Sequence, residues 1–169
     1  MELFTRSSSQ NQEMLGLWQE SFYKAKSAVL VVKGTSMEPT LPRGSHVLVT
    51  KAYPEEIIPG DIVVFKREGE LITHRVIDKF YSGERLFFAE KGDCIFRAAQ
   101  IEADLVVGKV VASLSDSQFD IGKDPLARYY RFLYKVRTAN RLRLPGSIRK
   151  LYWKLVFMGA GLRVRHKNQ

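Results

Sequence analysis

Residues 34–41, Gly-Thr-Ser-Met-Glu-Pro-Thr-Leu, are the stretch of sequence that decides the fold. They follow the apolar, largely β-branched run Ala28–Val32 and contain Pro39, so the pattern predicts a strand that enters a turn. A serine in such a turn, here Ser36, can present its hydroxyl beside backbone N–H groups. An acyl-transfer nucleophile needs this exposure and these donors for the developing oxyanion. The alternative is that Ser36 only caps the turn, as serine commonly does.

Short apolar runs continue after this turn to about residue 111. Each is between four and eight residues long, most are rich in Val and Ile, and Pro, Gly or acidic residues separate them. The expected strands are Ala28–Val32, His46–Thr50, Asp61–Lys66, Leu71–Ile77, Arg85–Glu90 and Leu105–Val111. Six closely spaced strands without intervening helices predict a mainly β fold, antiparallel and partly closed.

The net charge of +9 on the 169 residues is distributed unevenly. Residues 1–122 carry 14 Lys and Arg against 17 Asp and Glu, whereas residues 123–169 carry 13 Lys and Arg against one acid, Asp124. This asymmetry predicts a folded domain with a cationic appendage. We expect an N-terminal tail and helix at 1–27, a β domain at 28–122 and the basic appendage at 123–169.

Apolar residues at helical spacing predict three helices outside the β region. One is an amphipathic helix over residues 12–26; the other two lie in the appendage, over residues 126–142 and from Ser147, which can serve as its N-cap, to Gly159. Because the appendage mixes aromatic and basic residues, we expect it to contact anionic membrane surfaces. Basic helices packed on the domain are the alternative, and nucleic-acid binding is the least favoured reading.

The sequence contains no run of about 18 apolar residues and no apolar region near its start that would suit a secretory signal. We therefore expect a cytoplasmic protein, peripheral on the cytoplasmic face of the membrane. The three histidines are scattered and Cys94 is the only cysteine, so we expect no metal and no other cofactor. Cys94 is expected to be an inert, partly buried thiol.

The string Ser36-Met37-x-Pro39-Thr40-Leu41 resembles the nucleophile motif of the signal-peptidase and LexA-type serine peptidases, the S24/S26 superfamily. Further segments resemble the next elements of that superfamily in the same order: Val47–Lys51, Pro59–Phe65, Ile72–Ile77 and Glu90–Asp93. The resemblance covers roughly residues 28–111. It implies that the β domain is a catalytic core of the signal-peptidase and LexA kind.

The residue at the general-base position distinguishes the types within this superfamily. LexA-like proteins and bacterial-type signal peptidases have a lysine there, whereas this sequence has His74, followed by Arg75. That choice resembles the archaeal and endoplasmic-reticulum type of signal peptidase. The resemblance implies Ser36 as nucleophile and His74 as base, and an imidazole can accept and return a proton near neutral pH.

The sequence departs from the resembled type at the acid that would orient the histidine. No acidic residue follows Gly92-Asp93 at the short distance where that type has one. Asp93 is the best remaining candidate, Glu102 and Asp104 are weaker ones, and a Ser–His dyad is also open.

A second departure concerns the oxyanion hole. Bacterial signal peptidases often have a hydroxyl donor two residues before the nucleophile, where this chain has Gly34. We expect the Ser36 backbone N–H to be one donor, assisted by another backbone N–H or by Thr35. Asp61 is expected to be structural, holding the turn after Pro59.

The resemblance implies a serine endopeptidase that removes a leader or signal segment from a precursor protein. The alternative is a catalytically inactive module with the same fold that binds membranes or peptides. A LexA-like self-cleaving regulator is less favoured, because roughly 35 residues before Ser36 are too few for a DNA-binding domain and a linker.

Overall fold

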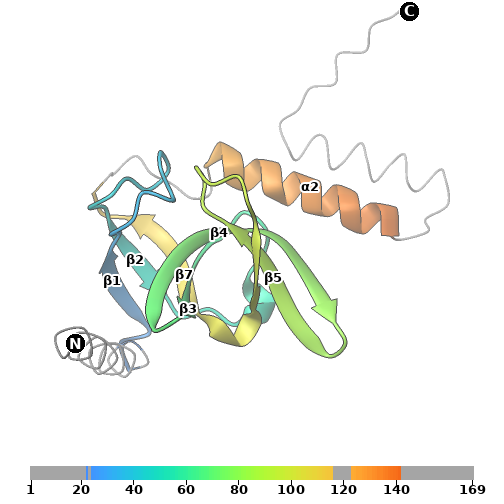
Figure 1. The fold of residues 1–169 in the computed structure, drawn as a ribbon, viewed down its shortest axis with the longest axis horizontal. Helices are drawn as coiled ribbons and strands as arrows, with labels where there is room; N and C mark the ends of the chain where they lie inside the picture. Colours follow the sequence, from blue (N-terminus) through green and yellow to red (C-terminus); the bar gives the residue numbers. More distant parts are fainter. Residues whose placement is uncertain (1–21, 23, 116–122, 142–169) are drawn as a thin grey trace, which may run out of the picture.

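The structure, a computed structural model, describes residue 22, residues 24–115 and residues 123–141. Seven strands form one antiparallel sheet in the order β1-β2-β7-β3-β4-β5-β6. Their bounds are β1 Ser27–Val31, β2 His46–Thr50, β3 Ile62–Arg67, β4 Glu70–Ser82, β5 Arg85–Lys91, β6 Ala99–Glu102 and β7 Val106–Ser113. The mainly β fold is therefore confirmed, and β4 arches across the sheet as its longest strand (Figure 1).

All six predicted strands are present, and five of them differ from the prediction by at most two residues at either end. β4 is longer than predicted because it continues through Asp78 to Ser82 as one arm of a hairpin with β5. β6 was not predicted. Only Ile101 of its four residues is buried, so the segment lacks the apolar pattern of a strand, and pairing with β5 defines it.

β3 explains how the sheet can form two apolar layers. Its alternating residues Ile62 and Val64 belong to one buried cluster, and Val63 and Phe65 to a second. A strand that is buried on both faces reads as a continuous apolar run, as Ile62–Phe65 does. The first cluster also contains Met37, so the turn that carries Ser36 is anchored in the core by its neighbour.

The helix α2, Pro125–Arg141, lies within one residue of the prediction at each end. It packs against the sheet (Figure 1), with Ala127 fully buried and Arg131 Nη2 3.1 Å from Asp61 Oδ1. Arg137 pairs with Asp78 of β4 further along the helix. These contacts agree with the alternative of basic helices packed on the domain for this part of the appendage.

Two predicted helices fall largely outside the described residues. Phe22, Lys24 and Ala25 are helical, and Phe22 is buried in the first cluster, but residues 12–21 and 23 are not described. The second basic helix lies outside the described residues altogether. Within the described ranges, no helix has the length and hydropathy needed to cross a membrane.

Candidate active site

Ser36 and His74 lie next to each other although 38 residues separate them. Ser36 is in the turn between β1 and β2, and His74 is on β4, where it pairs with Val63 of β3. The Ser36 Oγ is 3.1 Å from the His74 Nε2. This is the distance at which a histidine can take the proton of a serine nucleophile.

The second ring nitrogen of His74 contacts Glu90, not Asp93. The His74 Nδ1 lies 2.5 Å from the Glu90 Oε2. An ionised carboxylate can only accept hydrogen bonds, so Nδ1 donates its proton to Glu90 and the Nε2 lone pair faces the Ser36 hydroxyl. The expectation that Asp93 orients the histidine is therefore corrected, because Asp93 is bound elsewhere.

Glu90 is held as an anion by its surroundings. Its side chain is 1% exposed and also accepts a hydrogen bond of 2.6 Å from the Arg67 Nη2. Burial by itself would raise the pKa of the Glu90 carboxyl, but the hydrogen bonds from His74 and Arg67 outweigh burial and leave this pKa below its usual value. The result is a row of contacts from Ser36 through His74 and Glu90 to Arg67.

Asp93 forms a bidentate pair with Arg75. The Arg75 Nε and Nη2 donate to the two Asp93 carboxylate oxygens at 2.8 and 2.7 Å. The guanidinium is fully buried; its Nη1 donates to the Gly60 carbonyl at 2.9 Å, and its Nη2 is 2.7 Å from the Asp124 Oδ2. Burial alone would lower the pKa of Arg75, but Asp93 and Asp124 together raise it above its usual value, so the group stays charged.

The turn that begins at Gly92 supports the backbone of the nucleophile. A Cβ at Gly92 would lie 2.5 Å from the Ser36 carbonyl oxygen, so only glycine allows this approach. The Cys94 N–H donates to the same oxygen at 3.1 Å. Cys94 itself is exposed rather than partly buried, and its Sγ lies 3.1 Å from the Thr35 carbonyl oxygen.

Gly34 and Thr35, the residues expected beside an oxyanion hole, directly precede Ser36 in the turn after β1. Among the hydrogen bonds of the described residues, none uses the Ser36 N–H as a donor. A Cβ at Gly34 would be 4.0 Å from both the Ser36 N and Oγ, so this side of the nucleophile carries no side chain. Thr35 is exposed, and its carbonyl accepts from the Glu38 N–H at 3.0 Å.

A groove of about 810 Å³ opens beside Ser36 and His74. One wall is β1 with the residues that follow it, and the other is the start of β4. Its lining includes Val29, Leu30, Met37, Leu71 and Ile72, with Arg67 and Glu70 also contributing. β1 pairs only with β2 and stands at the end of the strand order, so its other edge faces no described strand.

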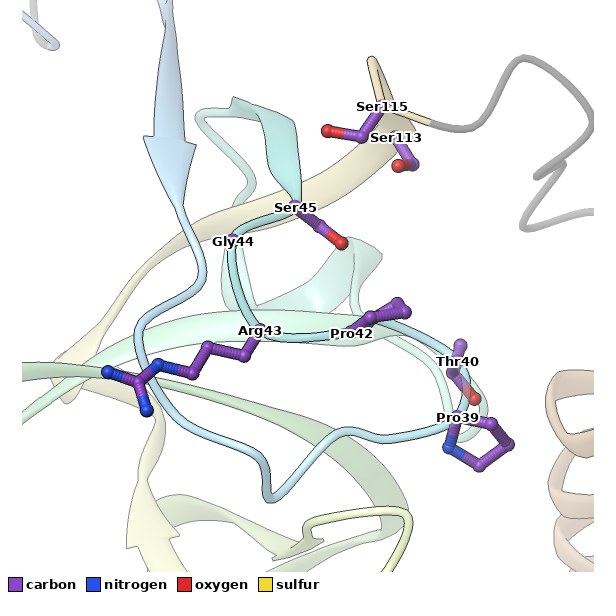
Figure 2. A pocket seen from close by; sticks show the side chains of 8 residues that line it. All are labelled: Pro39, Thr40, Pro42, Arg43, Gly44, Ser45, Ser113 and Ser115. Atoms are coloured by element: carbon purple, nitrogen blue, oxygen red, sulfur yellow. The ribbon is translucent and has the colours of Figure 1, made fainter.

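A second cavity, of about 400 Å³, lies away from this pair and includes neither Ser36 nor His74. Its lining carries the hydroxyls of Ser45, Ser113 and Ser115, and the Arg43 side chain extends away from them (Figure 2). No group of three or more His, Cys, Asp or Glu that could hold a metal ion occurs among the described residues.

The site contains two residues that the sequence analysis did not assign, Glu90 and Arg67. A signal for Glu90 was present in the sequence, because Phe88 and Glu90 are two residues apart on a predicted strand and therefore share one face of it. A carboxylate that shares a face with a core aromatic residue needs a buried partner. Register supplies that partner: Glu90 lies opposite Val76, two residues from His74 on the same face of β4.

Comparisons with known proteins relate the chain to peptidases. A family model described as Peptidase S24-like matches residues 6–111. The chain is 35% identical over 91 residues to Signal peptidase I W of Bacillus subtilis (strain 168), covering 53% of this chain and 43% of that protein. It is 37% identical over 70 residues to the Signal peptidase complex catalytic subunit SEC11 of Metarhizium acridum (strain CQMa 102), covering 40% of this chain and 41% of that one.

The matched regions thus span less than half the length of these curated relatives. The family match includes the β core with Ser36, His74 and Glu90, whereas α2 lies beyond residue 111, where that match ends. The family match covers more than half of the chain, and the paired Ser36 and His74 lie within it. The chain belongs to the Peptidase S24-like family, in the S24/S26 peptidase superfamily.

Proposed function

We propose that this chain is a serine endopeptidase that cleaves an extended segment of a precursor protein, with Ser36, His74 and Glu90 as its catalytic triad. The observation that carries the proposal is the pair of contacts on one imidazole, 3.1 Å to the Ser36 Oγ and 2.5 Å to the Glu90 Oε2. A serine, a histidine and a buried carboxylate in this order form the arrangement that activates a serine hydroxyl.

In the first half of the reaction, the Ser36 Oγ attacks the carbonyl carbon of the scissile peptide bond. The His74 Nε2 takes the hydroxyl proton, and the Glu90 carboxylate stabilises the imidazolium that results. The Ser36 N–H faces the developing oxyanion and donates to it. The C–N bond then breaks, and the imidazolium returns the proton to the leaving amine.

In the second half, a water molecule attacks the acyl-enzyme ester. His74 takes one proton from this water and gives it to the Ser36 Oγ as the ester bond breaks. The products are the original enzyme and a carboxylic acid, which ionises by releasing the second proton of the water to solvent, so the proton count balances over the cycle.

The groove suits an extended peptide as substrate. β1 offers a backbone edge, and the apolar side chains of Val29, Leu71 and Met37 line the same space. A peptide that lies in a groove beside a sheet edge binds through main-chain hydrogen bonds, and alternate side chains enter pockets. The similarity to two proteins named as signal peptidases supports a leader or signal segment as the part that is removed.

A fluorophosphonate probe, which phosphonylates activated serines, tests the proposal directly. The protein should be labelled at Ser36, and Ser36→Ala and His74→Ala should each lose labelling and peptide cleavage while remaining folded. The effects should not add in the double variant, because the two residues act as a unit. Ser82→Ala and His46→Ala, at exposed positions outside the groove, are the matched controls. An unlabelled, folded wild-type protein would favour an inactive peptide-binding module.

We also propose that α2 brings the enzyme to anionic membrane surfaces. Tyr129 and Leu133 are exposed and lie four residues apart, and so on one face of the helix, whereas Ala127 and Arg131 contact the β domain. The exposed Arg128 and a following segment without acidic residues supply positive charge. An apolar face beside basic residues is typical of interfacial helices.

A further inference from the structure

The buried guanidinium of Arg75 connects α2 to the nucleophile. Asp93 holds it from the turn behind Ser36, Gly60 from the turn before β3, and Asp124 from the start of α2. Each of these three contacts measures between 2.7 and 2.9 Å. Among the hydrogen bonds and ion pairs of the described residues, none joins these three groups to the Ser36 hydroxyl or the His74 ring, so any effect on catalysis acts through position.

Asp124 performs two structural tasks at once. Its Oδ1 accepts from the Leu126 N–H at 2.9 Å and its carbonyl accepts from the Arg128 N–H at 3.1 Å, so it is the N-cap of α2. Its Oδ2 lies 2.7 Å from the Arg75 Nη2, and its side chain is 6% exposed. The helix therefore cannot move away from the sheet without removing one carboxylate from Arg75.

The first turn of α2 also covers the same region by direct packing. Gly60 has φ +97°, and a Cβ there would lie 2.5 Å from the Ala127 carbonyl oxygen. The Gly60 carbonyl, in turn, is the acceptor for the Arg75 Nη1. Water reaching Arg75 after α2 left would weaken its pair with Asp93, since ion pairs are strongest when they are desolvated.

The turn held by Asp93 determines where the backbone of Ser36 lies. The Cys94 N–H donates to the Ser36 carbonyl at 3.1 Å, and Gly92 lies against that same carbonyl. A nucleophile displaced by about 1 Å can lose about a hundredfold in rate. The Ser36 Oγ must stay near the His74 Nε2, so a looser turn would lower the reactivity of the serine.

We propose that α2 is part of the catalytic apparatus, and that Asp124 is a positioning residue that acts on Ser36 through Arg75 and Asp93. The inference rests on the proposed serine-peptidase function and adds a residue beyond the segment matched by the family, which ends at residue 111. Activity thereby depends on the docked state of a helix that also begins the basic appendage.

The test compares Asp124→Asn with Arg137→Gln in the full chain. Asparagine keeps the cap of α2 but removes the negative charge that faces Arg75. Arg137→Gln removes an ion pair of the same helix that does not involve Arg75. We expect Asp124→Asn to lower the rate of Ser36 phosphonylation and kcat about tenfold, with KM changed less than twofold. Arg137→Gln should stay within twofold of wild type. A wild-type labelling rate in folded Asp124→Asn overturns the inference.

Hydrogen exchange in the wild-type protein provides a measurement that needs no variant and no activity. If α2 holds the turn, the Cys94 N–H should exchange no more than threefold more slowly than the Arg128 N–H, because release of the helix releases the turn. A Cys94 N–H that exchanges more than a hundredfold more slowly shows that the helix opens alone, and this overturns the inference. Failure of the wild-type protein to react with the probe would instead count against the peptidase proposal.

Discussion

Replacing Glu90 with Gln tests the catalytic triad most sharply. The carboxylate oxygen lies 2.5 Å from the His74 Nδ1 in a region where the two side chains are 1% and 12% exposed. With charge centres about 4 Å apart and an effective dielectric constant near 20, the attraction between imidazolium and carboxylate is about 4 kcal/mol. Because each 1.36 kcal/mol changes a rate about tenfold, the loss corresponds to about a thousandfold in kcat.

The neutral amide adds a second effect on the histidine. Its NH₂ group can donate to Nδ1, and the ring proton then moves to Nε2, where it blocks acceptance of the Ser36 proton. The equivalent exchange in a Ser–His–Asp triad lowers kcat about 10⁴-fold. We therefore expect kcat/KM of Glu90→Gln to fall about 10³- to 10⁴-fold.

The assay is cleavage of a peptide substrate, together with the rate of Ser36 phosphonylation. Glu102→Gln is the matched control, since this carboxylate on β6 is 44% exposed and its removal should change kcat/KM less than twofold. A Glu90→Gln enzyme within tenfold of wild type would refute the assignment of Glu90. So would an Asp93→Asn enzyme that loses as much as Glu90→Gln while keeping the His74 ring oriented.

The lowered pKa of Glu90 gives the same prediction a readout in stability. A carboxyl with a folded-state pKa below its unfolded value of about 4.3 stabilises the fold above that pH, and the contribution is lost as the pH falls through the folded pKa. The difference in unfolding free energy between wild type and Glu90→Gln should therefore be constant near neutral pH and shrink below about pH 4. A difference that grows on acidification would contradict an ionised Glu90.

Three further predictions concern the surroundings of the site. Arg67→Gln should raise the pKa of the catalytic carboxylate and lower kcat/KM about fivefold at neutral pH, more at acidic pH, as a pH–rate profile can show. Gly60→Ala should cost about 2 kcal/mol or more of unfolding free energy in a denaturant titration, because its Cβ would strike the first turn of α2; Gly83→Ala, also at positive φ but with nothing within 4 Å, should cost less. Leu133→Asp should reduce co-sedimentation with anionic vesicles at low salt, whereas Leu105→Asp, at a similarly exposed leucine (42% against 39%), should not; equal binding by both would exclude α2 as the contact.

The fold was largely predictable because its information is local. The runs His46–Thr50 and Asp61–Lys66 show strand patterns within five or six residues, and turn residues separate them. Ser36 and His74 could be assigned because each lies in a short segment that resembles a known motif. The contact between Ser36 and His74 requires only that the turn after β1 lies against β4.

The carboxylate that contacts His74 could not be assigned from the sequence in the same way. Asp93 and Glu90 are three residues apart in the sequence, and only the register between β4 and β5 decides which one reaches His74. The bulge between Val76 and Asp78 is part of that register, and no local pattern predicts it. Arg75 next to His74 was the available clue to Asp93, since a buried guanidinium requires a carboxylate.

The basic appendage shows how composition can point to two partners at once. Its charge predicted an anionic surface outside the molecule, yet Arg131 and Arg137 form ion pairs with Asp61 and Asp78 of the β domain. Because residues 1–122 carry a net negative charge, the domain is itself an acidic partner for α2. The positive charge of α2 therefore does not distinguish a membrane surface from the acidic β domain as its partner. The argument depends on the apolar side chains of Tyr129 and Leu133, which are exposed on the same helix, gain nothing from the ion pairs and would gain from burial in a bilayer interface.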